Sequence, residues 1–359
     1  MRKKTRTIRI GRTAIGGEEP VRIQSMPNTD TADIEATAAQ IATLEAAGCE
    51  IVRVAAYDKH SAGCIAKLKE KVNIPIVADV HFDYRIAIAA IEAGADKVRI
   101  NPGNIGSEQN IQKVADAARM HGVPIRVGAN TGSLDKKYWG TDKSAALVES
   151  ALDNVRCLEK AGFSNIVIAL KASNVAASVA AYRRMSELVD YPLHLGITEA
   201  GAYESSIVKS AMGIGALLLD GIGDTVRVSI TGDPVQEVRA AREILQCAGR
   251  RIFSPEIVAC PTCARTRIQL EPLYYQVKAM TQDIPKYLKI AVMGCPVNGP
   301  GEARDADIGI AGGEGVGIIF KKGKPVRKVP EAELLRAFEE ELQELQQLRI
   351  TYLIYQWEQ

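Results

Sequence analysis

Short segments rich in β-branched residues alternate with longer amphipathic segments through the first two thirds of the chain. Several of the longer segments end at a glycine of the kind that terminates helices, among them Gly48 and Gly122. The eight short segments are residues 21–26, 51–56, 74–82, 97–104, 124–132, 165–174, 193–201 and 225–234. Eight strands separated by helices predict a closed (β/α)8 TIM barrel. An open doubly wound sheet is the alternative, because neither strand propensity nor spacing determines closure.

The composition excludes some classes of partner. The 359-residue chain is 47% hydrophobic and 25% charged, and its formal net charge is +2, which does not indicate a nucleic-acid surface over the whole chain. It contains no run of eighteen apolar residues, and its basic start is not followed by an apolar segment of signal-peptide length. We therefore expect a cytoplasmic protein with neither nucleic acid nor membrane as a partner.

Arginines occupy similar positions in four of the predicted strands, each between two β-branched residues. They are Arg53, Arg99, Arg126 and Arg227. An unpaired buried charge is costly, so each arginine pairs with a barrel carboxylate, points outward to a helix or binds a ligand. Four guanidinium groups at similar positions favour a polyanion site, because their donors match phosphate oxygens two at a time. Arg22 lies early in its strand, so we exclude it from the site.

Further polar residues follow at or just beyond the strand ends, where TIM barrels place their chemistry. They are Asp79, His81, Asn101, Asn130, Lys171, Ser173, Glu199 and Ser229. His81 alone is more typical of a structural histidine than of a catalyst, although Asp79 projects to the same face and can orient it or pair with an arginine. Glu199 is the only carboxylate of its segment, so it is a candidate proton donor or acceptor, with a structural counter-ion as the alternative.

The chain changes character after the last barrel helix. We predict a barrel domain over residues 1–248, a polar linker over 249–255 and a small α+β domain over 256–359. The small domain reads as a strand, a cysteine loop, a helix, a second and third strand, a hairpin turning near "KKGK" and a long charged helix. The glycines of "AGGEGVG" are not followed by the lysine of a phosphate loop, so we interpret them as structural.

The seven cysteines fall into two groups. Those that stand alone in apolar or helical patterns are interpreted as small buried hydrophobes; they are Cys49, Cys64, Cys157 and Cys247. The other three stand beside proline and glycine, in "CPTC" and "GCPVNGPGE"; they are Cys260, Cys263 and Cys295. A thioredoxin-like dithiol is an alternative for the first two alone.

Metal and cluster sites usually have four ligands, and the three cysteines lack a fourth thiolate or imidazole nearby. No histidine follows His194 and no cysteine follows Cys295, which leaves Glu302, Asp305 and Asp307 as candidates. Three thiolates and a carboxylate fit a reactive iron–sulfur cluster better than a structural zinc site, because a carboxylate is a weaker and more exchangeable ligand of iron. The Gly-Pro-Gly turn would let Glu302 face that site.

Seven blocks together resemble the 4-hydroxy-3-methylbut-2-en-1-yl diphosphate synthases over essentially the whole chain. The blocks are "RIQSMPNTDT", "ADVHFD", "KVRINPGN", "RVGANTGSL", "GITEAG", "CPTC" and "GCPVNGPGEA". The resemblance implies a TIM barrel with a [4Fe-4S] domain. It also implies reductive ring opening and dehydration of 2-C-methyl-D-erythritol 2,4-cyclodiphosphate in the methylerythritol phosphate route to isoprenoids. The product would be (E)-4-hydroxy-3-methylbut-2-enyl diphosphate. Ferredoxin or flavodoxin would supply the two electrons that the reaction needs, and the protein would be a homodimer.

The resemblance also carries roles to particular residues. It implies Cys260, Cys263, Cys295 and Glu302 as cluster ligands. Glu199 would be the acid that assists loss of a hydroxyl as water, and loosening of Glu302 would open a position on iron. The implied substrate-binding residues are Arg53, His81, Arg99, Arg126, Asn130, Lys171, Arg227 and Ser229.

Two other functions compete with this interpretation. One is a barrel that transfers a group to or from a pterin-like substrate, with a structural metal domain attached. The other is a non-catalytic module whose cysteine domain is a zinc ribbon that contacts nucleic acid. The second needs a basic surface, whereas the C-terminal segment mixes charges of both signs.

Overall fold

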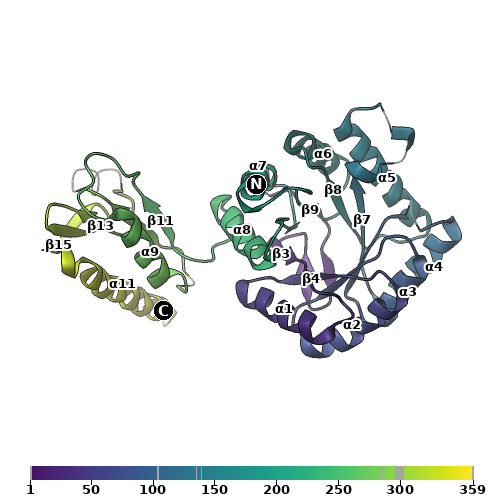
Figure 1. Cartoon of the computed structure of the whole chain (residues 1–359), viewed down its shortest axis with the longest axis horizontal. Coiled ribbons are helices and arrows are strands. Elements are labelled where there is room, and N and C mark those ends of the chain that lie inside the picture. Colours follow the sequence, from purple (N-terminus) through teal and green to yellow (C-terminus); the bar gives the residue numbers. More distant parts are fainter. Residues whose placement is uncertain are drawn as a thin grey trace. The chain divides into compact units, whose positions relative to one another are not determined.

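The computed structural model describes residues 2–102, 105–134, 136–138, 140–284, 286–295 and 303–357. For residues 133, 136 and 347–357 it describes the backbone alone. The chain forms two compact units, Met1–Arg251 and Ile252–Gln359, so the division falls inside the expected linker 249–255 (Figure 1). In the described part of the chain, no helix is long and apolar enough to cross a membrane.

The first unit contains one parallel sheet of eight strands in the order β8-β7-β6-β5-β4-β3-β10-β9. The strands are β3 (Arg22–Ser25), β4 (Ile51–Ala55), β5 (Ile76–Asp79), β6 (Lys97–Ile100), β7 (Ile125–Asn130), β8 (Ile166–Lys171), β9 (His194–Leu195) and β10 (Thr225–Val226). A parallel bridge between Ile168 and Leu193 joins the two end strands, so the sheet curls into a nearly closed barrel. The predicted TIM barrel is confirmed. Strands β9 and β10, however, are only two residues long and end well before the last residues of the predicted segments 193–201 and 225–234.

Helices surround this barrel on its outside (Figure 1). They are α1 (Ile34–Ala47), α2 (Lys59–Lys71), α3 (Tyr84–Glu92), α4 (Glu108–His121), α5 (Lys143–Lys160), α6 (Val175–Leu188), α7 (Tyr203–Leu219) and α8 (Pro234–Cys247). Six begin after an Asp or Asn whose side chain accepts a hydrogen bond from a first-turn N–H, which satisfies one of the free donors there. Gly48 and Gly122 end α1 and α4 in the left-handed conformation, as the sequence predicts.

A short hairpin closes the barrel at the end where its strands begin. Its strands are β1 (Ile8–Ile10) and β2 (Thr13–Ile15). The buried side chains of Ile8, Ile10 and Ile15 pack with those of Ile51, Val77 and Val167, each near the start of its barrel strand. We call these six residues the isoleucine plug. The sequence does not predict this hairpin, because three-residue strands show too little alternation to be recognised.

The second unit is a five-stranded mixed sheet in the order β11-β12-β13-β14-β15, with the α+β character predicted for it. Its elements are β11 (Glu256–Ala259), α9 (Leu270–Thr281), β12 (Lys289–Met293), β13 (Ile308–Gly312), β14 (Val316–Lys321), β15 (Lys324–Pro330) and α11 (Leu334–Trp357). Strands β11, β12 and β13 are parallel, whereas β14 and β15 form an antiparallel hairpin that turns at Lys322 and Gly323, both with positive φ. Both helices contribute to one apolar cluster with β12, β13, β14 and β15, and a second cluster includes Ala291, Ala311 and Phe320 of β12, β13 and β14.

Candidate functional site

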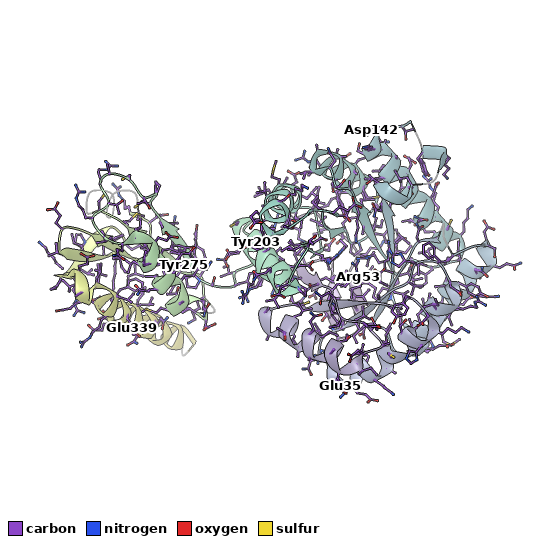
Figure 2. The ribbon with its side chains drawn as sticks, in the orientation of Figure 1. Glu35, Arg53, Asp142, Tyr203, Tyr275 and Glu339 are labelled. Atoms are coloured by element: carbon purple, nitrogen blue, oxygen red, sulfur yellow. The ribbon has the colours of Figure 1, made fainter. Side chains whose placement is uncertain are left out.

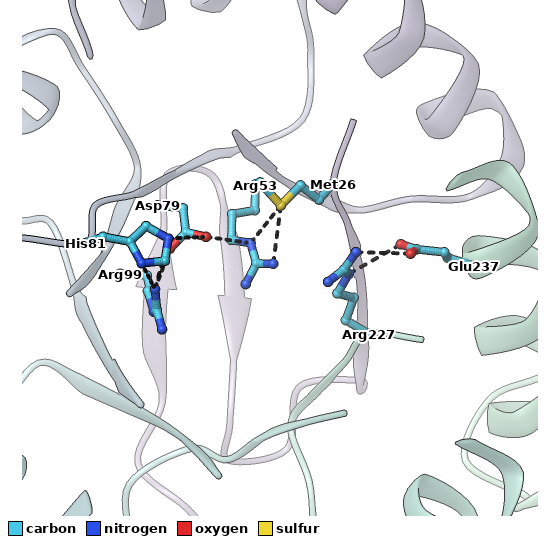
Figure 3. Close-up of polar contacts among 7 residues, drawn as sticks. All are labelled: Met26, Arg53, Asp79, His81, Arg99, Arg227 and Glu237. Carbon is cyan, nitrogen blue, oxygen red and sulfur yellow. Dashed lines mark hydrogen bonds and ion pairs between the residues drawn. The ribbon is translucent and has the colours of Figure 1, made fainter. Parts of the chain in front are cut away.

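A buried carboxylate holds two arginines at the carboxyl ends of the barrel strands. Asp79 ends β5, and its oxygens lie 3.1 Å from a terminal nitrogen of Arg99 and 3.5 Å from Nε of Arg53 (Figure 3). Burial alone would raise the pKa of Asp79, but the charges of Arg53 and Arg99 hold that pKa below its usual range. Asp79 is therefore ionised at neutral pH and fixes the two guanidinium groups in place.

Arg53 points into the barrel, whereas Glu35 and Asp142 lie on the outer surface (Figure 2). Its Nε and one terminal nitrogen also contact the sulfur of Met26, at 3.3 and 3.2 Å. Burial lowers the pKa of Arg53 to about 10. The charge of Asp79 opposes this shift, and the charges of Arg227 and Arg99 add to it. The side chain remains a cation in a crowded cationic environment.

Arg227 has a carboxylate partner that the sequence analysis missed. Its guanidinium lies 3.0 Å from Glu237 on α8, and the same carboxylate accepts hydrogen bonds from Ser25 Oγ and the backbone of Ile230 (Figure 3). Glu237 is 3% exposed. Three of the four predicted arginines therefore have carboxylate partners, which is the structural alternative considered for them, yet they still line the same end of the barrel.

Arg126 differs from the other three arginines. It lies on β7, is fully buried, and none of its guanidinium nitrogens has a hydrogen-bond partner among the described residues. Lys171 ends the neighbouring strand β8, in register with Asn130. Burial and the charges of Arg53 and Arg126 hold the pKa of Lys171 well below its usual range.

His81 lies at the rim of this site. One terminal nitrogen of Arg99 is 3.3 Å from its Nδ1, and its Nε2 is 3.8 Å from Asp79. Burial lowers the pKa of His81 although Asp79 opposes the shift, so the ring is largely neutral at pH 7. Ser229 is half-buried just beyond β10, and its backbone carbonyl accepts a hydrogen bond from Ser206 Oγ.

Glu199 is in a loop rather than at a strand end, which corrects the sequence prediction. Strand β9 ends at Leu195, and Glu199 follows as an exposed residue in the left-handed conformation with φ of 54°. Non-glycine residues adopt this conformation at a cost of roughly 1 kcal/mol or more, and such strain is concentrated at functional sites. The loop therefore directs the Glu199 side chain at an energetic cost to the fold.

The three predicted cysteine ligands follow two neighbouring parallel strands of the second unit. Cys260 comes directly after β11, Cys263 lies in the same loop, and Cys295 follows β12. The backbone N–H of Gly294 donates to the sulfur of Cys260 at 3.1 Å, which ties the two loops together. A backbone N–H of Arg265 lowers the pKa of the exposed Cys263 thiol.

Of the three candidates for the fourth ligand, Asp305 and Asp307 lie away from the cysteines. Asp305 pairs with Lys289 at 2.5 Å, and Asp307 accepts a hydrogen bond from the backbone of Lys289, the first residue of β12. Both acids therefore lie near the start of β12, at the opposite end of this strand from Cys295. Glu302 lies outside the described residues, and within the described ranges no three His, Cys, Asp or Glu side chains form a metal site.

A parallel barrel with clustered cations at the strand ends, joined to a cysteine-bearing α+β unit, defines a TIM-barrel protein equipped to bind a small anionic ligand. Residues 5–242 match the family model described as the GcpE TIM-barrel domain, and residues 256–344 match the GcpE protein C-terminal domain. The chain belongs to the GcpE family, the 4-hydroxy-3-methylbut-2-en-1-yl diphosphate synthases.

Curated relatives cover nearly the full length of the chain. A protein of Caldanaerobacter subterraneus subsp. tengcongensis is 57% identical over 349 residues, which are 96% of this chain and 98% of that protein. A protein of Desulfotalea psychrophila is 54% identical over 352 residues, 96% of this chain and 97% of that protein. Both are named 4-hydroxy-3-methylbut-2-en-1-yl diphosphate synthase (flavodoxin).

Solved structures that resemble the chain share its fold at low sequence identity. Dihydropteroate synthase from Stenotrophomonas maltophilia aligns with a TM-score of 0.52 and 19% identity, over 68% of this chain and 98% of that one. The Xanthomonas albilineans enzyme aligns with a TM-score of 0.51 and 13% identity, over 68% and 99%. Identities this low show the fold alone.

Proposed function

We propose that this chain opens the ring of 2-C-methyl-D-erythritol 2,4-cyclodiphosphate and removes a hydroxyl as water, giving (E)-4-hydroxy-3-methylbut-2-enyl diphosphate. The observation that carries the proposal is the identity above 50% with relatives of one name over almost the entire chain. The cationic mouth of the barrel agrees with a diphosphate substrate. Neither the pterin transfer nor the zinc-ribbon function has comparable support.

The excess of cations over carboxylates supports diphosphate binding at the strand ends. Arg53 and Arg99 share Asp79, Arg227 pairs with Glu237, and no carboxylate of the described residues pairs with Arg126 or Lys171. We assign the diphosphate to the predicted residues of this mouth. They are Arg53, His81, Arg99, Arg126, Asn130, Lys171, Arg227 and Ser229. Their charge also stabilises the negative charge that develops on the phosphate oxygen when its bond to carbon breaks.

Glu199 is the proposed proton donor. Its exposed carboxyl group belongs to a loop that follows β9 on the same side of the barrel as the mouth. The strained backbone at this residue restricts the directions in which the side chain can point. Protonation of the departing hydroxyl by Glu199 makes water the leaving group.

We further propose that Cys260, Cys263, Cys295 and Glu302 hold a [4Fe-4S] cluster. Thiolate is the preferred ligand of such clusters, and the three cysteines follow adjacent parallel strands at one sheet edge. The Gly294 N–H donates to Cys260 Sγ, as amides around cluster sulfurs commonly do. When bound, the cluster supplies electrons singly to the substrate. Flavodoxin, which the names of the relatives include, is the proposed donor, and ferredoxin is the alternative.

Turnover without oxygen tests the proposed function. Full-length protein with reconstituted cluster, the cyclic diphosphate and either a chemical reductant or reduced flavodoxin should yield the linear allylic diphosphate, measured by mass spectrometry. Omission of the reductant should abolish the product. If the protein holds zinc without acid-labile sulfide, or makes no product with its iron in place, the proposal is wrong. The homodimer and the cytoplasmic location remain predictions, which sedimentation and cell fractionation check.

A further inference from the structure

Four polar side chains inside the barrel have buried atoms without a hydrogen-bond partner among the described residues. They are Gln24, Lys97, Arg126 and His194, each at most 1% exposed. Buried polar atoms in folded proteins almost always have a partner, which can be protein, ordered water or a bound ion. Four such side chains therefore require an explanation, and the diphosphate proposal explains only Arg126.

Strand geometry directs two of these side chains into the barrel, deeper than the mouth. Lys97 precedes Arg99 by two residues on β6, so both point to the same face of the sheet. Gln24 likewise precedes Met26 by two residues, and the sulfur of Met26 contacts the inward-pointing Arg53. Lys97 and Gln24 are therefore one step nearer to the closed end of the barrel than Arg99 and Met26.

The other two side chains belong to the same region. Thr225 Oγ1 is 2.7 Å from Nδ1 of His194, so Thr225 can donate to Nδ1 and leave a proton on the buried Nε2. Burial, and then the charges of Arg126 and Lys97, hold the pKa of His194 well below its usual range. Arg126 is also the strongest of the charges that lower the pKa of Lys97. These three buried side chains, on β6, β7 and β9, therefore interact electrostatically.

Charge balance distinguishes an anion from water in this space. Asp79 offsets one of the two charges of Arg53 and Arg99, and Glu237 compensates Arg227. Among the described residues no carboxylate lies within 4.0 Å of Lys97 or Arg126, although both are fully buried. Water can satisfy their donors but can neither compensate the charge of Arg126 nor keep the buried Lys97 protonated, and an uncompensated buried charge is strongly unfavourable. A small anion does both.

We propose that Gln24, Lys97, Arg126 and His194 bind one small monovalent inorganic anion, such as chloride, inside the barrel beneath the mouth. Lys97 and Arg126 supply the charge, while the Gln24 amide and the His194 ring donate hydrogen bonds. The site lies deeper than the proposed diphosphate site, because Lys97 pairs in register with Val77, a member of the isoleucine plug, while Arg126, in register with Arg99, borders both sites. It does not depend on the proposed function.

Bromide is a suitable probe, because it replaces chloride and scatters anomalously. Crystals of the full-length, substrate-free protein are soaked in sodium bromide, and data are collected on both sides of the bromine absorption edge. We expect one peak within hydrogen-bonding distance of Lys97 Nζ and His194 Nε2. Absence of a peak there, or an ordered water at full occupancy, overturns the proposal. This measurement uses the wild-type protein, so it decides the question even where a variant does not fold.

Thermal unfolding tests the site at solution concentrations. At constant ionic strength, replacement of gluconate, an anion larger than chloride, by chloride should raise the midpoint of thermal unfolding by about 3 °C. Lys97→Met should remove this rise, whereas Lys67→Met, at an exposed position of α2, should keep it. An equal rise in Lys97→Met overturns the proposal. So does an unresponsive wild type, which would mean that bromide binds at crystal concentration only.

Discussion

The mouth of the barrel and the cysteine edge of the small unit both lie at the carboxyl ends of parallel strands, but they are built differently. At the mouth, charged groups project from the strands themselves and are braced by buried carboxylates, as Asp79 braces Arg53 and Arg99. At the cysteine edge, Cys260 and Cys263 share a loop beyond β11. The Gly294 N–H donates to Cys260 Sγ and the Arg267 N–H donates to the Gly294 carbonyl, and these hydrogen bonds join that loop to the loop of Cys295.

The difference separates a preorganised site from a site that its cofactor completes. A braced mouth loses little conformational entropy when a ligand binds, so affinity comes from contacts already in place. Ligand loops of a metal site acquire much of their geometry from the metal, and binding is then coupled to local folding. Changes at the cysteine edge should therefore affect assembly, whereas changes at the mouth should affect binding, rate and stability.

The largest expected effect is at the cysteine edge. Cys295→Ser should abolish cluster assembly and turnover, because one of four ligands is lost. Iron and acid-labile sulfide per chain measure the loss. Cys247 of α8 is exposed, so the prediction that it is buried is wrong, and Cys247→Ser is the matched control that should keep both. Full iron content in Cys295→Ser would show that this cysteine is not a ligand.

Glu199→Gln should lower kcat by about 100- to 1000-fold, because the proton donor is lost while the diphosphate contacts remain. KM should change little, and the iron content should not change. Glu204→Gln, in the first turn of α7, is the control with the same chemical change. Steady-state kinetics under reducing conditions separate the two parameters. A raised KM at unchanged kcat would assign Glu199 to binding instead.

Asp79→Asn should lower the unfolding free energy by about 3 kcal/mol, because two buried guanidinium groups lose their counter-ion. Asp116→Asn breaks an exposed Asp–Arg pair and should change it by less than about 1 kcal/mol. Urea titrations of both variants measure the contrast. A small effect of Asp79→Asn would mean that the mouth is not braced as described.

The same carboxylate makes a prediction about pH. The pKa of Asp79 is below its unfolded value of about 3.9, so its stabilisation is present above that pH and is lost as the pH falls toward the folded pKa. The stability difference between wild type and Asp79→Asn should therefore stay constant from about pH 5 to 8 and shrink below about pH 4. Urea titrations across this range check the sign.

The smallest effect concerns the cysteine loop. Thr266 Oγ1 accepts a hydrogen bond from the Cys263 N–H at 3.1 Å, and Thr266→Val removes that bond at a cost of about 1 kcal/mol. The cluster should still assemble, but iron should pass to a chelator several-fold faster. Thr266→Ser keeps the hydroxyl and should behave as wild type. Failure of Thr266→Val to assemble a cluster would mean that the loop is preorganised after all.

The sequence predicted the repeating architecture well, because eight strand–helix units produce a strong periodic pattern. It also located Arg53, Arg99 and Arg227 correctly near one end of the barrel. It could not predict the partner Glu237, because that residue lies on a helix where charge is ordinarily a sign of exposure. The backbone strain at Glu199 was equally invisible, since φ depends on the tertiary path of the loop.

Lys97 and His194 were missed for a different reason. Each lies in a predicted strand segment, and alternation from Arg99 could have placed Lys97 on the inner face. Nothing in the pattern indicates that a lysine will be fully buried without a carboxylate, because that depends on what the neighbouring strands place around it. Such positions become visible only when burial and partners are known.

Among the described residues, the isoleucine plug closes one end of the barrel and leaves the carboxyl ends of the strands as the entrance. A molecule that enters the interior through the strand ends must leave by the same route, because the hairpin seals the opposite end with buried side chains. Incoming and outgoing molecules therefore exclude one another, and the reaction product should inhibit competitively against the substrate. Traffic through one entrance also means that any protein covering the mouth would control both arrival and departure.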